Sequence, residues 1–275
     1  MLNTTYFDTI DTQEKAYWFG FILADGGLHK NGKQVRVLLA SKDRKHLEKL
    51  ANVFNVRIHD NAVVDRRTNR TYLRSMVHLN SVRIWTAIVD KGVPQRKCDF
   101  TSADVLDSLS PALLRHFARG YFDGDGSIGK VGFAEFRLTI VGPRCIVTAL
   151  RDLVAEALDV SCGAPAYQSG IWRITWCGTD KLNTIRNWLY DDATVFLERK
   201  KLIFDQLPQF RGSSRHKGVY YIKAKRHWVA RVYREGRMRT IGQYESESAA
   251  KEALDRHVVG FDSAAPAVMA DFVRG

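Results

Sequence analysis

Two aspartates, Asp25 and Asp125, are the residues of this 275-residue chain whose type and spacing best suit chemistry. Each ends an apolar stretch, and each is followed by glycine. A carboxylate at a helix C-terminus opposes the helix dipole, and two neighbouring carboxylates repel each other, so such a pair needs a compensating cation. Mg²⁺ takes one or two carboxylates and fills its other positions with water and phosphate oxygens. One copy alone would be an ordinary turn, but two matching copies favour a metal site.

Small residues before the two aspartates predict how the two stretches meet. A glycine inside a helix costs about 1 kcal/mol relative to alanine, so an apolar helix that keeps one four residues before another small residue favours contact with a second backbone. Gly20 and Ala24 in the first stretch should therefore face Gly120 and Gly124 in the second. Two helices packed in this way end side by side, which brings their terminal carboxylates together.

Residues 18–26 and 118–126 both resemble the LAGLIDADG motif of homing endonucleases. The second copy fits better, because it has the penultimate acid of the motif as Asp123, where the first copy has Leu23 and begins with two bulky aromatic residues. In that family the final aspartate of each copy binds metal. The resemblance therefore assigns the metal site to the two final aspartates and the glycines that follow them, namely Asp25, Gly26, Asp125 and Gly126.

The resemblance also implies an activity and a cofactor. A single-chain member of this family is a monomer that hydrolyses one phosphodiester in each strand of double-stranded DNA, using metal-activated water. It acts at a long asymmetric target and leaves short 3′ overhangs. The cofactor would be Mg²⁺ or another divalent ion such as Mn²⁺.

Two lysines extend this assignment. Family members often place a lysine near the scissile phosphates, where it stabilises charge or polarises the attacking water. Lys97 and Lys200 follow the closing helix of each predicted half and are the catalytic candidates by that resemblance. An alternative role stays open for both, because basic residues near helix C-termini also offset the helix dipole.

The order of elements around the two motifs predicts an internal duplication. The first half, residues 1–100, and the second half, residues 101–207, should each contain a motif helix, a first strand, a helix, a hairpin and a closing helix. After the motif helices we place these elements at residues 34–40, 43–55, 56–79 and 81–91, and again at 136–141, 143–158, 165–177 and 180–190. The predicted fold class is α+β: two αββαββα halves about a pseudo-twofold axis, each with a four-stranded antiparallel sheet that can expose one face.

Helix caps support the two motif helices. Asp11 and Glu14 have the spacing of a capping box before the first, and Ser110 precedes Pro111 at the start of the second. We therefore expect Asp11 and Ser110 to be the N-cap residues.

The first predicted hairpin is rich in arginine. Arginine and asparagine can form bidentate contacts with guanine and adenine edges, and a two-stranded ribbon fits the major groove of DNA. The alternative is a solvated basic surface. We expect DNA contacts from five arginines of this hairpin and, more weakly, from one in the second: Arg57, Arg66, Arg67, Arg70, Arg74 and Arg173.

The composition changes after Leu207. Residues 208–216 have the composition of a linker, and residues 211–239 contain ten arginines and lysines against one acid, a bias typical of a phosphate-facing surface. Residues 217–275 resemble the Apetala-type (ethylene-response-factor-like) DNA-binding domain, which implies a small three-stranded antiparallel sheet with one helix. The matching residues are Gly218, Trp228, Ala230, Gly242, Tyr244, Ala249, Ala250, Ala253 and Asp255.

In the Apetala-type family the sheet enters the major groove, so the basic residues of these strands become contact candidates. Trp228 serves either as a contact or as a core residue. The candidates are Arg226, Trp228, Arg231, Arg234, Arg237 and Arg239.

Overall composition agrees with a nucleic-acid partner. The formal charge of +12 and the pI near 9.6 favour a polyanion. The sequence has no apolar run near the roughly 18 residues that a membrane-spanning helix needs, so we expect no membrane partner. Four scattered cysteines suit reduced thiols. We expect a cytoplasmic, nucleoid-associated protein of a bacterial or phage-infected cell.

Two other functions on the same scaffold stay open. A DNA-binding regulator would keep the fold without catalysis, although both motif acids are present here. An RNA maturase would use the basic surfaces on structured RNA. Comparing affinity for duplex DNA and folded RNA separates the maturase from the other two.

Overall fold

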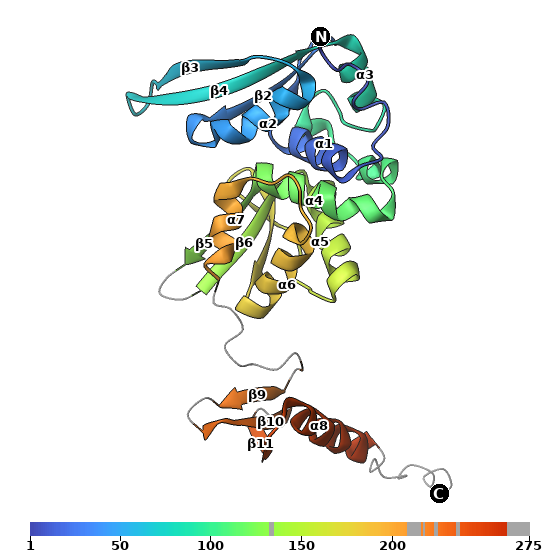
Figure 1. The fold of residues 1–275 in the computed structure, drawn as a ribbon, viewed down its shortest axis with the longest axis vertical. Coiled ribbons are helices and arrows are strands. Elements are labelled where there is room, and N and C mark those ends of the chain that lie inside the picture. The colour runs from blue at the N-terminus through green and yellow to red at the C-terminus, as the bar shows by residue number, and fades with distance from the viewer. Residues whose placement is uncertain (132–134, 208–215, 217, 223–224, 235–236, 263–275) are drawn as a thin grey trace, which may run out of the picture. The chain divides into compact units, whose positions relative to one another are not determined.

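The computed structural model describes residues 1–131, 135–207, 216, 218–222, 225–234 and 237–262. The chain forms two compact units, Met1–Leu207 and Pro208–Gly275. The larger unit consists of two halves with the same order of elements, which follow one another from blue to orange in Figure 1.

The first half begins with the first motif helix and builds one antiparallel sheet. Its elements are α1 (Gln13–Asp25), β1 (Gly26–Leu28), β2 (Gln34–Ala40), α2 (Arg44–Phe54), β3 (Ile58–Asp65), β4 (Arg70–Asn80) and α3 (Val82–Val89). The strand order is β1-β2-β4-β3, and all neighbours are antiparallel. Strand β1, which begins with two glycines, has too little β-propensity to be placed from the sequence.

The second half repeats this arrangement. Its elements are α4 (Pro111–Asp125), β5 (Gly126–Val131), β6 (Glu135–Gly142), α5 (Arg144–Leu158), β7 (Ala166–Gln168), β8 (Ile171–Cys177) and α6 (Thr179–Tyr190). The strand order β5-β6-β8-β7 matches that of the first sheet. Together the two halves confirm the predicted αββαββα duplication. One further helix, α7 (Glu198–Asp205), follows the second half and was not predicted.

The start of α1 corrects one expectation. The N-cap is Thr12, whose hydroxyl oxygen accepts a hydrogen bond from the Lys15 backbone N–H at 3.2 Å. Asp11 lies one residue outside the helix and pairs with the Lys15 ammonium at 2.8 Å. Helix α4 begins as expected, with Ser110 at the N-cap position and Pro111 as its first residue.

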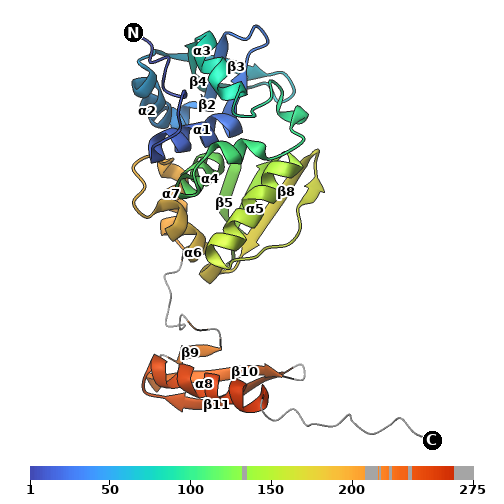
Figure 2. The same cartoon turned by 90° about the vertical axis from the view of Figure 1, so that its right-hand side faces the viewer.

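Each sheet is covered by helices on one face, as Figure 2 shows for α5 on the second sheet. Alternate residues point to the covered face and form the core, because side chains alternate along a strand. In the first half these include Val35 and Val37 of β2 and Val77 of β4, and in the second Leu138 and Trp176, all essentially inaccessible to solvent. Among the described residues of the larger unit, no helix of the same half covers the opposite face of its sheet, which leaves room for a partner.

The smaller unit is a separate three-stranded antiparallel sheet with one helix. Its elements are β9 (Val219–Ile222), β10 (His227–Arg234), β11 (Arg237–Tyr244) and α8 (Glu247–Asp262), with strand order β11-β10-β9. The Ser246 hydroxyl oxygen accepts from the Ala249 N–H at 3.2 Å and caps the helix. Val219, Ala230, Ala250 and Leu254 form its small core.

Candidate active site

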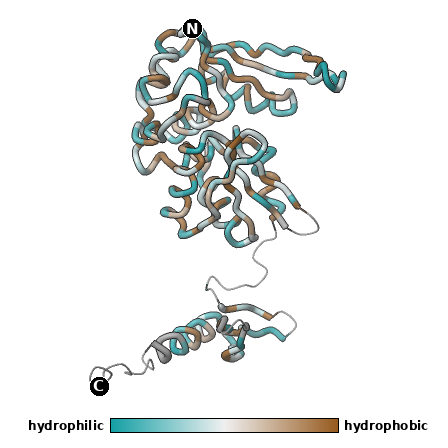
Figure 3. Tube along the Cα trace, turned by 180° about the vertical axis from the view of Figure 1, so that it is seen from behind, coloured by the Kyte–Doolittle hydropathy of each residue, from teal (hydrophilic) through white to brown (hydrophobic). Residues whose placement is uncertain are grey.

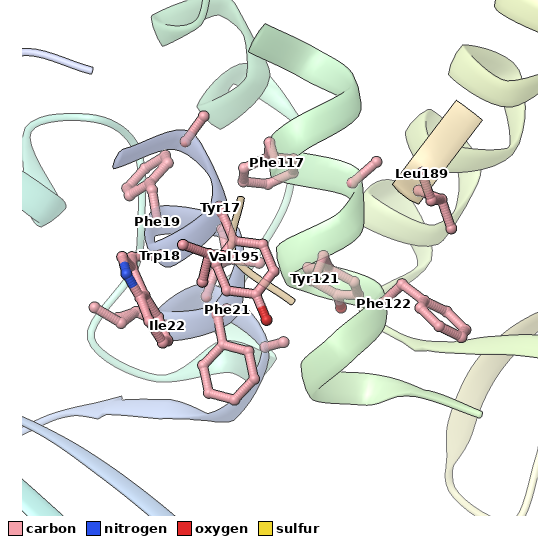
Figure 4. Packing of buried hydrophobic residues seen from close by; sticks show 14 of the residues in the cluster. Tyr17, Trp18, Phe19, Phe21, Ile22, Phe117, Tyr121, Phe122, Leu189 and Val195 are labelled. Carbon is pink, nitrogen blue, oxygen red and sulfur yellow. The ribbon is translucent and has the colours of Figure 1, made fainter. Parts of the chain in front are cut away.

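The two motif helices, α1 and α4, pack backbone to backbone. A Cβ built on Gly20 would lie 2.2 Å from the Phe117 carbonyl oxygen, and one on Gly120 would lie 1.9 Å from that of Tyr17. No side chain fits in either place, which explains why both helices keep a glycine there. Figure 4 shows the aromatic residues of both helices packed around this seam.

The seam continues to the C-terminal ends of the two helices. A Cβ on Gly124 would lie 2.4 Å from the Ala24 Cβ and 3.4 Å from the Asp25 nitrogen. Both helices end at the motif aspartate, and the next glycine donates its N–H to a carbonyl four residues back, Gly26 to Ile22 and Gly126 to Phe122. The structure therefore brings the two helix ends together in the way that the glycine spacing predicts.

Both motif aspartates are partly buried, and burial controls their acidity. Desolvation raises the pKa of Asp25 above its ordinary value, against the attraction of nearby cations led by Lys200 and Lys97. Desolvation raises the pKa of Asp125 to about 6, with a further increase from the charge of Asp25. The charge of Asp25 therefore acts on Asp125, which places both carboxylates in one electrostatic site.

The two catalytic lysine candidates have different environments. Lys97 is exposed, although partial desolvation of its ammonium lowers its pKa. The attraction of Asp125 and Asp25 opposes that shift, so both motif aspartates act on its charge. Lys200 is only 4% exposed. Desolvation lowers its pKa to about 8.

The Lys200 ammonium closes the end of α4. Its three N–H groups are shared among the carbonyl oxygens of Phe122 at 2.7 Å, Asp123 at 2.6 Å, Gly124 at 3.0 Å and Gly126 at 2.5 Å. The carbonyls of Asp123 and Gly124 belong to the last turn of α4, where a helix supplies no N–H partner of its own. The geometry therefore differs from the role expected for Lys200 at the scissile phosphate, because its hydrogen-bonding capacity is used inside the protein to hold Asp125 in place.

Asp123, the penultimate acid of the second motif, links the two halves. Its carboxylate is buried and accepts hydrogen bonds from the hydroxyls of Tyr17 and Tyr190, both at 2.8 Å, and from the Leu197 N–H at 2.7 Å. Tyr17 belongs to α1, and its hydroxyl also lies 2.9 Å from His46 Nε2. The sequence offered no sign of this network beyond the acid itself.

The start of α7 and the residue Phe196 before it contact the first half. Arg199 donates to both carboxylate oxygens of Asp43 at 3.0 and 2.9 Å. Lys49 of α2 forms an ion pair with Glu198 and donates to the Phe196 carbonyl at 3.1 Å. These contacts bring Asp43 and Arg199 into the surroundings of Asp25, where both influence its pKa.

The open face of the first sheet carries two of the predicted DNA contacts, Arg70 and Arg74. Because Val77 and Leu79 are buried, Arg70, Arg74 and His78 of β4 point to the other face. The register pairs Arg74 with Asn61 of β3, and His78 with Arg36 of β2. Arg36 was not among the predicted contacts.

The other predicted arginines of this half lie at the ends of β3. Arg57 precedes the strand, and Arg66 and Arg67 lie in the turn after it, where all three are exposed. The hairpin extends well beyond the rest of the sheet, and its end is hydrophilic (Figure 3). In the second half Arg173 points to the open face of β8 and is partly buried.

The predicted DNA contacts of the smaller unit differ in their surroundings: some are exposed, and others pack on aromatic rings. Arg226 and Arg239 are exposed. The Arg231 guanidinium lies over the Tyr220 ring at 5.7 Å, and Trp228 packs on Tyr221 with ring centroids 5.1 Å apart. The side chains of Arg234 and Arg237 lie outside the described residues.

Larger ligand clusters are not found in the part of the chain that the structure describes. There, no group of three or more histidine, cysteine, aspartate or glutamate side chains is placed to hold a metal ion. None of the described helices has the length and apolarity that a membrane crossing requires.

Comparison with known proteins identifies the fold. No protein-family model matches the sequence, and no curated protein is significantly similar to it. The structure is similar to that of the homing endonuclease I-WcaI bound to its DNA recognition sequence, with a TM-score of 0.51 and 12% identity, covering 70% of this chain and 87% of that one.

Two further structures resemble the chain more distantly. The LAGLIDADG homing endonuclease I-GzeII in complex with its DNA target has a TM-score of 0.46 at 15% identity, covering 69% of this chain and 87% of that one. The N-terminal LAGLIDADG domain of DUF199/WhiA has a TM-score of 0.44 at 13% identity, covering 68% and 89%. The similarity to I-WcaI shows that this chain has the LAGLIDADG fold, and at this identity it shows the fold alone.

Proposed function

We propose that the protein is a site-specific homing endonuclease that hydrolyses one phosphodiester bond in each strand of a long asymmetric DNA target and leaves short 3′ overhangs. The observation that carries this proposal is the pair of partly buried carboxylates, Asp25 and Asp125, at the adjoining ends of two closely packed helices. A fold can be kept after its chemistry is lost. A pair of acids that is costly to bury is better explained by a function at that place.

The acid pair fits a divalent cation. Burial raises the pKa of both carboxyls although Lys97, Lys200 and Arg199 lie near enough to oppose it, so the chain itself does not fully compensate their charge. Asp25 and Asp125 would hold Mg²⁺ or Mn²⁺, with the backbone of Gly26 and Gly126 beside them. The ion would supply an acidified water and neutralise charge on the phosphate.

The other residues of the site would bind and orient the substrate. Lys97, whose charge faces both aspartates, would stabilise the negative charge that develops on the scissile phosphate. Lys200 would act as a positioning residue, because it holds the end of α4. The arginines on the open face of the first sheet would bind the flanking DNA, and a single chain with both motif helices would act as a monomer.

The smaller unit would add a second DNA-binding surface. Its three-stranded sheet and alanine-rich helix agree with an Apetala-type domain, and its exposed Arg226 would contact phosphates. Each neutralised phosphate makes binding tighter and more sensitive to salt. This unit would therefore lengthen the contact with the target.

The test is cleavage of a plasmid that carries the DNA flanking this reading frame, joined without it, in Mg²⁺ and in EDTA. Asp25→Asn or Asp125→Asn should each lower double-strand cutting by more than about a hundredfold, beyond the loss typical of residues that only support metal ligands. Asp107→Asn, at an exposed aspartate outside the motifs, is the matched control.

The outcomes distinguish the alternatives. Full activity in either motif variant would refute the assignment. Tight DNA binding by the wild type without cutting would indicate a regulator, and preference for folded RNA would indicate a maturase.

A further inference from the structure

A pocket of about 480 Å³ opens beside Asp125, the second motif aspartate. Its walls include Lys97 and Asp125 from the site, Arg144 from the start of α5, and Tyr167 and Trp172 from the β7–β8 hairpin. The volume lies within the range of about 300–1,000 Å³ that is usual for small-ligand sites. It therefore combines aromatic surface, two cations and direct contact with the proposed reaction centre.

The aromatic wall is formed by the hairpin turn. Ser169 and Gly170 both have positive φ, 53° and 81°, which is the geometry of a two-residue hairpin turn. Directly across the hairpin Tyr167 pairs with Trp172, and their ring centroids lie 5.3 Å apart. The Arg144 guanidinium lies 4.8 Å from the centre of the Trp172 ring. Tyr167 is 62% exposed, so part of its ring is free to stack.

The first half has a different structure at the corresponding place. The pairs Gly26–Val37 and Gly126–Ile140 align the two sheets. From these pairs Gly142 corresponds to Leu39, so its neighbour Trp172 corresponds to Ser75.

By the same register Tyr167 corresponds to Asp60, which pairs with Ser75 in the first half. There the Ser75 hydroxyl and the Arg44 guanidinium both donate to the Asp60 carboxylate. Arg44 begins α2 as Arg144 begins α5. Where the first half has a hydrogen-bonded ion pair, the second half has two aromatic rings and an open pocket.

We infer that this pocket binds one unstacked nucleobase of the DNA, next to the phosphate at Asp125. The inference deepens the proposed function and rests on it. Aromatic rings offer a stacking surface to any base, and each stacked base contributes substantially to binding. Bases inside a duplex are stacked on their neighbours and have no free face, so only a base turned out of the helix can stack on such a surface.

The charges of the pocket suit a base that is still part of a strand. Lys97 and Arg144 lie on its walls, where they can neutralise the phosphates on either side of the base. Because the first half has an ion pair at the corresponding place, the protein would unstack a base in one strand only. The two strands would then be handled unequally although the two motif aspartates are matched.

The test compares a short duplex containing one central unpaired 2-aminopurine with its fully paired parent, in EDTA so that no cutting occurs. The wild type should bind the unpaired form about tenfold more tightly, in line with one stacked base, and 2-aminopurine fluorescence should be quenched. Trp172→Ala and Tyr167→Ala should abolish this ratio, and Trp172→Phe, which keeps an aromatic face, should retain it.

A matched control comes from the first hairpin. Tyr72→Ala removes an exposed aromatic residue there and should weaken both duplexes alike, leaving the ratio unchanged. Thermal melting of each variant checks that it is folded. Equal affinity of the wild type for the two duplexes, or an unchanged ratio in folded Trp172→Ala and Tyr167→Ala, would overturn the inference. Preference for the unpaired base in a protein that does not cut DNA would keep the inference and refute the proposed function.

Discussion

The two halves of the larger unit contribute equivalent helices, α1 and α4, to their contact, but the residues around that contact differ. Both keep the glycine that allows the helices to touch and the aspartate that ends them. They differ in the lysine that follows, since Lys97 is exposed and Lys200 is buried, and in the penultimate motif position, which is Leu23 in one and Asp123 in the other. The backbone contact is therefore the symmetric part of the fold, and the polar network around it is not.

The largest expected difference between the halves is at these two lysines. Lys200→Met removes a buried ammonium that attracts the buried Asp123 carboxylate and binds the carbonyls at the end of α4, and it should lower the free energy of unfolding by about 3–5 kcal/mol. Lys97→Met should change it by less than about 0.5 kcal/mol, because that side chain is exposed. Urea denaturation measures both. Similar losses in the two variants would show that the lysines have equivalent roles.

Lowering the pH should decrease the stability of the two halves by similar amounts. Burial lowers the pKa of His46 in the first half and of His116 in the second to about 4. Below pH 6.5 the unfolded chain binds protons that the folded chain does not, so stability should fall between pH 6.5 and pH 4, by at most about 3 kcal/mol for each histidine.

Unfolding curves across that range, for the wild type and for His46→Gln and His116→Gln, test this expectation. Each substitution should reduce the loss on acidification. A wild-type stability that rises as the pH falls from 6.5 to 4 would contradict it.

Removing the hydrogen bond between Tyr17 of the first half and Asp123 of the second should have a smaller effect on the free energy of unfolding. Tyr17→Phe removes one donor from the buried Asp123 carboxylate and should cost about 1–3 kcal/mol. Tyr190→Phe removes the donor on the other carboxylate oxygen within the second half and is the matched comparison. A double-mutant cycle of the two tyrosines gives their coupling. No change in unfolding free energy for Tyr17→Phe would show that water replaces the hydroxyl.

The smallest expected difference is between the β3–β4 and β7–β8 hairpins. It concerns the salt dependence of DNA affinity rather than the free energy of unfolding. Arg70→Ala and Arg74→Ala, on the open face of β4, should each reduce the slope of log affinity against log salt by about 1. Arg173→Ala should have a weaker effect because the Nε atom of its guanidinium is inaccessible to solvent. Fluorescence anisotropy at several salt concentrations measures the slopes. Equal slopes for all three would remove the distinction between the two hairpins.

The sequence predicted the elements whose pattern is local. Alternating apolar residues predicted β2 at its observed bounds, Gln34–Ala40, and the glycine spacing predicted the contact between α1 and α4. The capping box failed because Thr12 competes with Asp11 for the N-cap position.

Features that depend on contacts between distant segments could not be predicted. A basic run such as residues 199–201 is normally solvated, and only the folded chain shows that Lys200 is buried. The pairing of Trp172 with Tyr167 beside Asp125 depends in the same way on the register of three strands.

The hydrogen bond from Tyr17 to Asp123 makes the pairing of the two halves unequal, because donor and acceptor lie in different halves. A dimer of two first halves would contain two tyrosines and, at the partner position, two copies of Leu23. A dimer of two second halves would place Phe117 where Tyr17 now lies, so each Asp123 carboxylate would keep Tyr190 and Leu197 as donors but lose the third. If the chain were split between its halves, we therefore expect the two different polypeptides to pair with each other in preference to pairing with themselves.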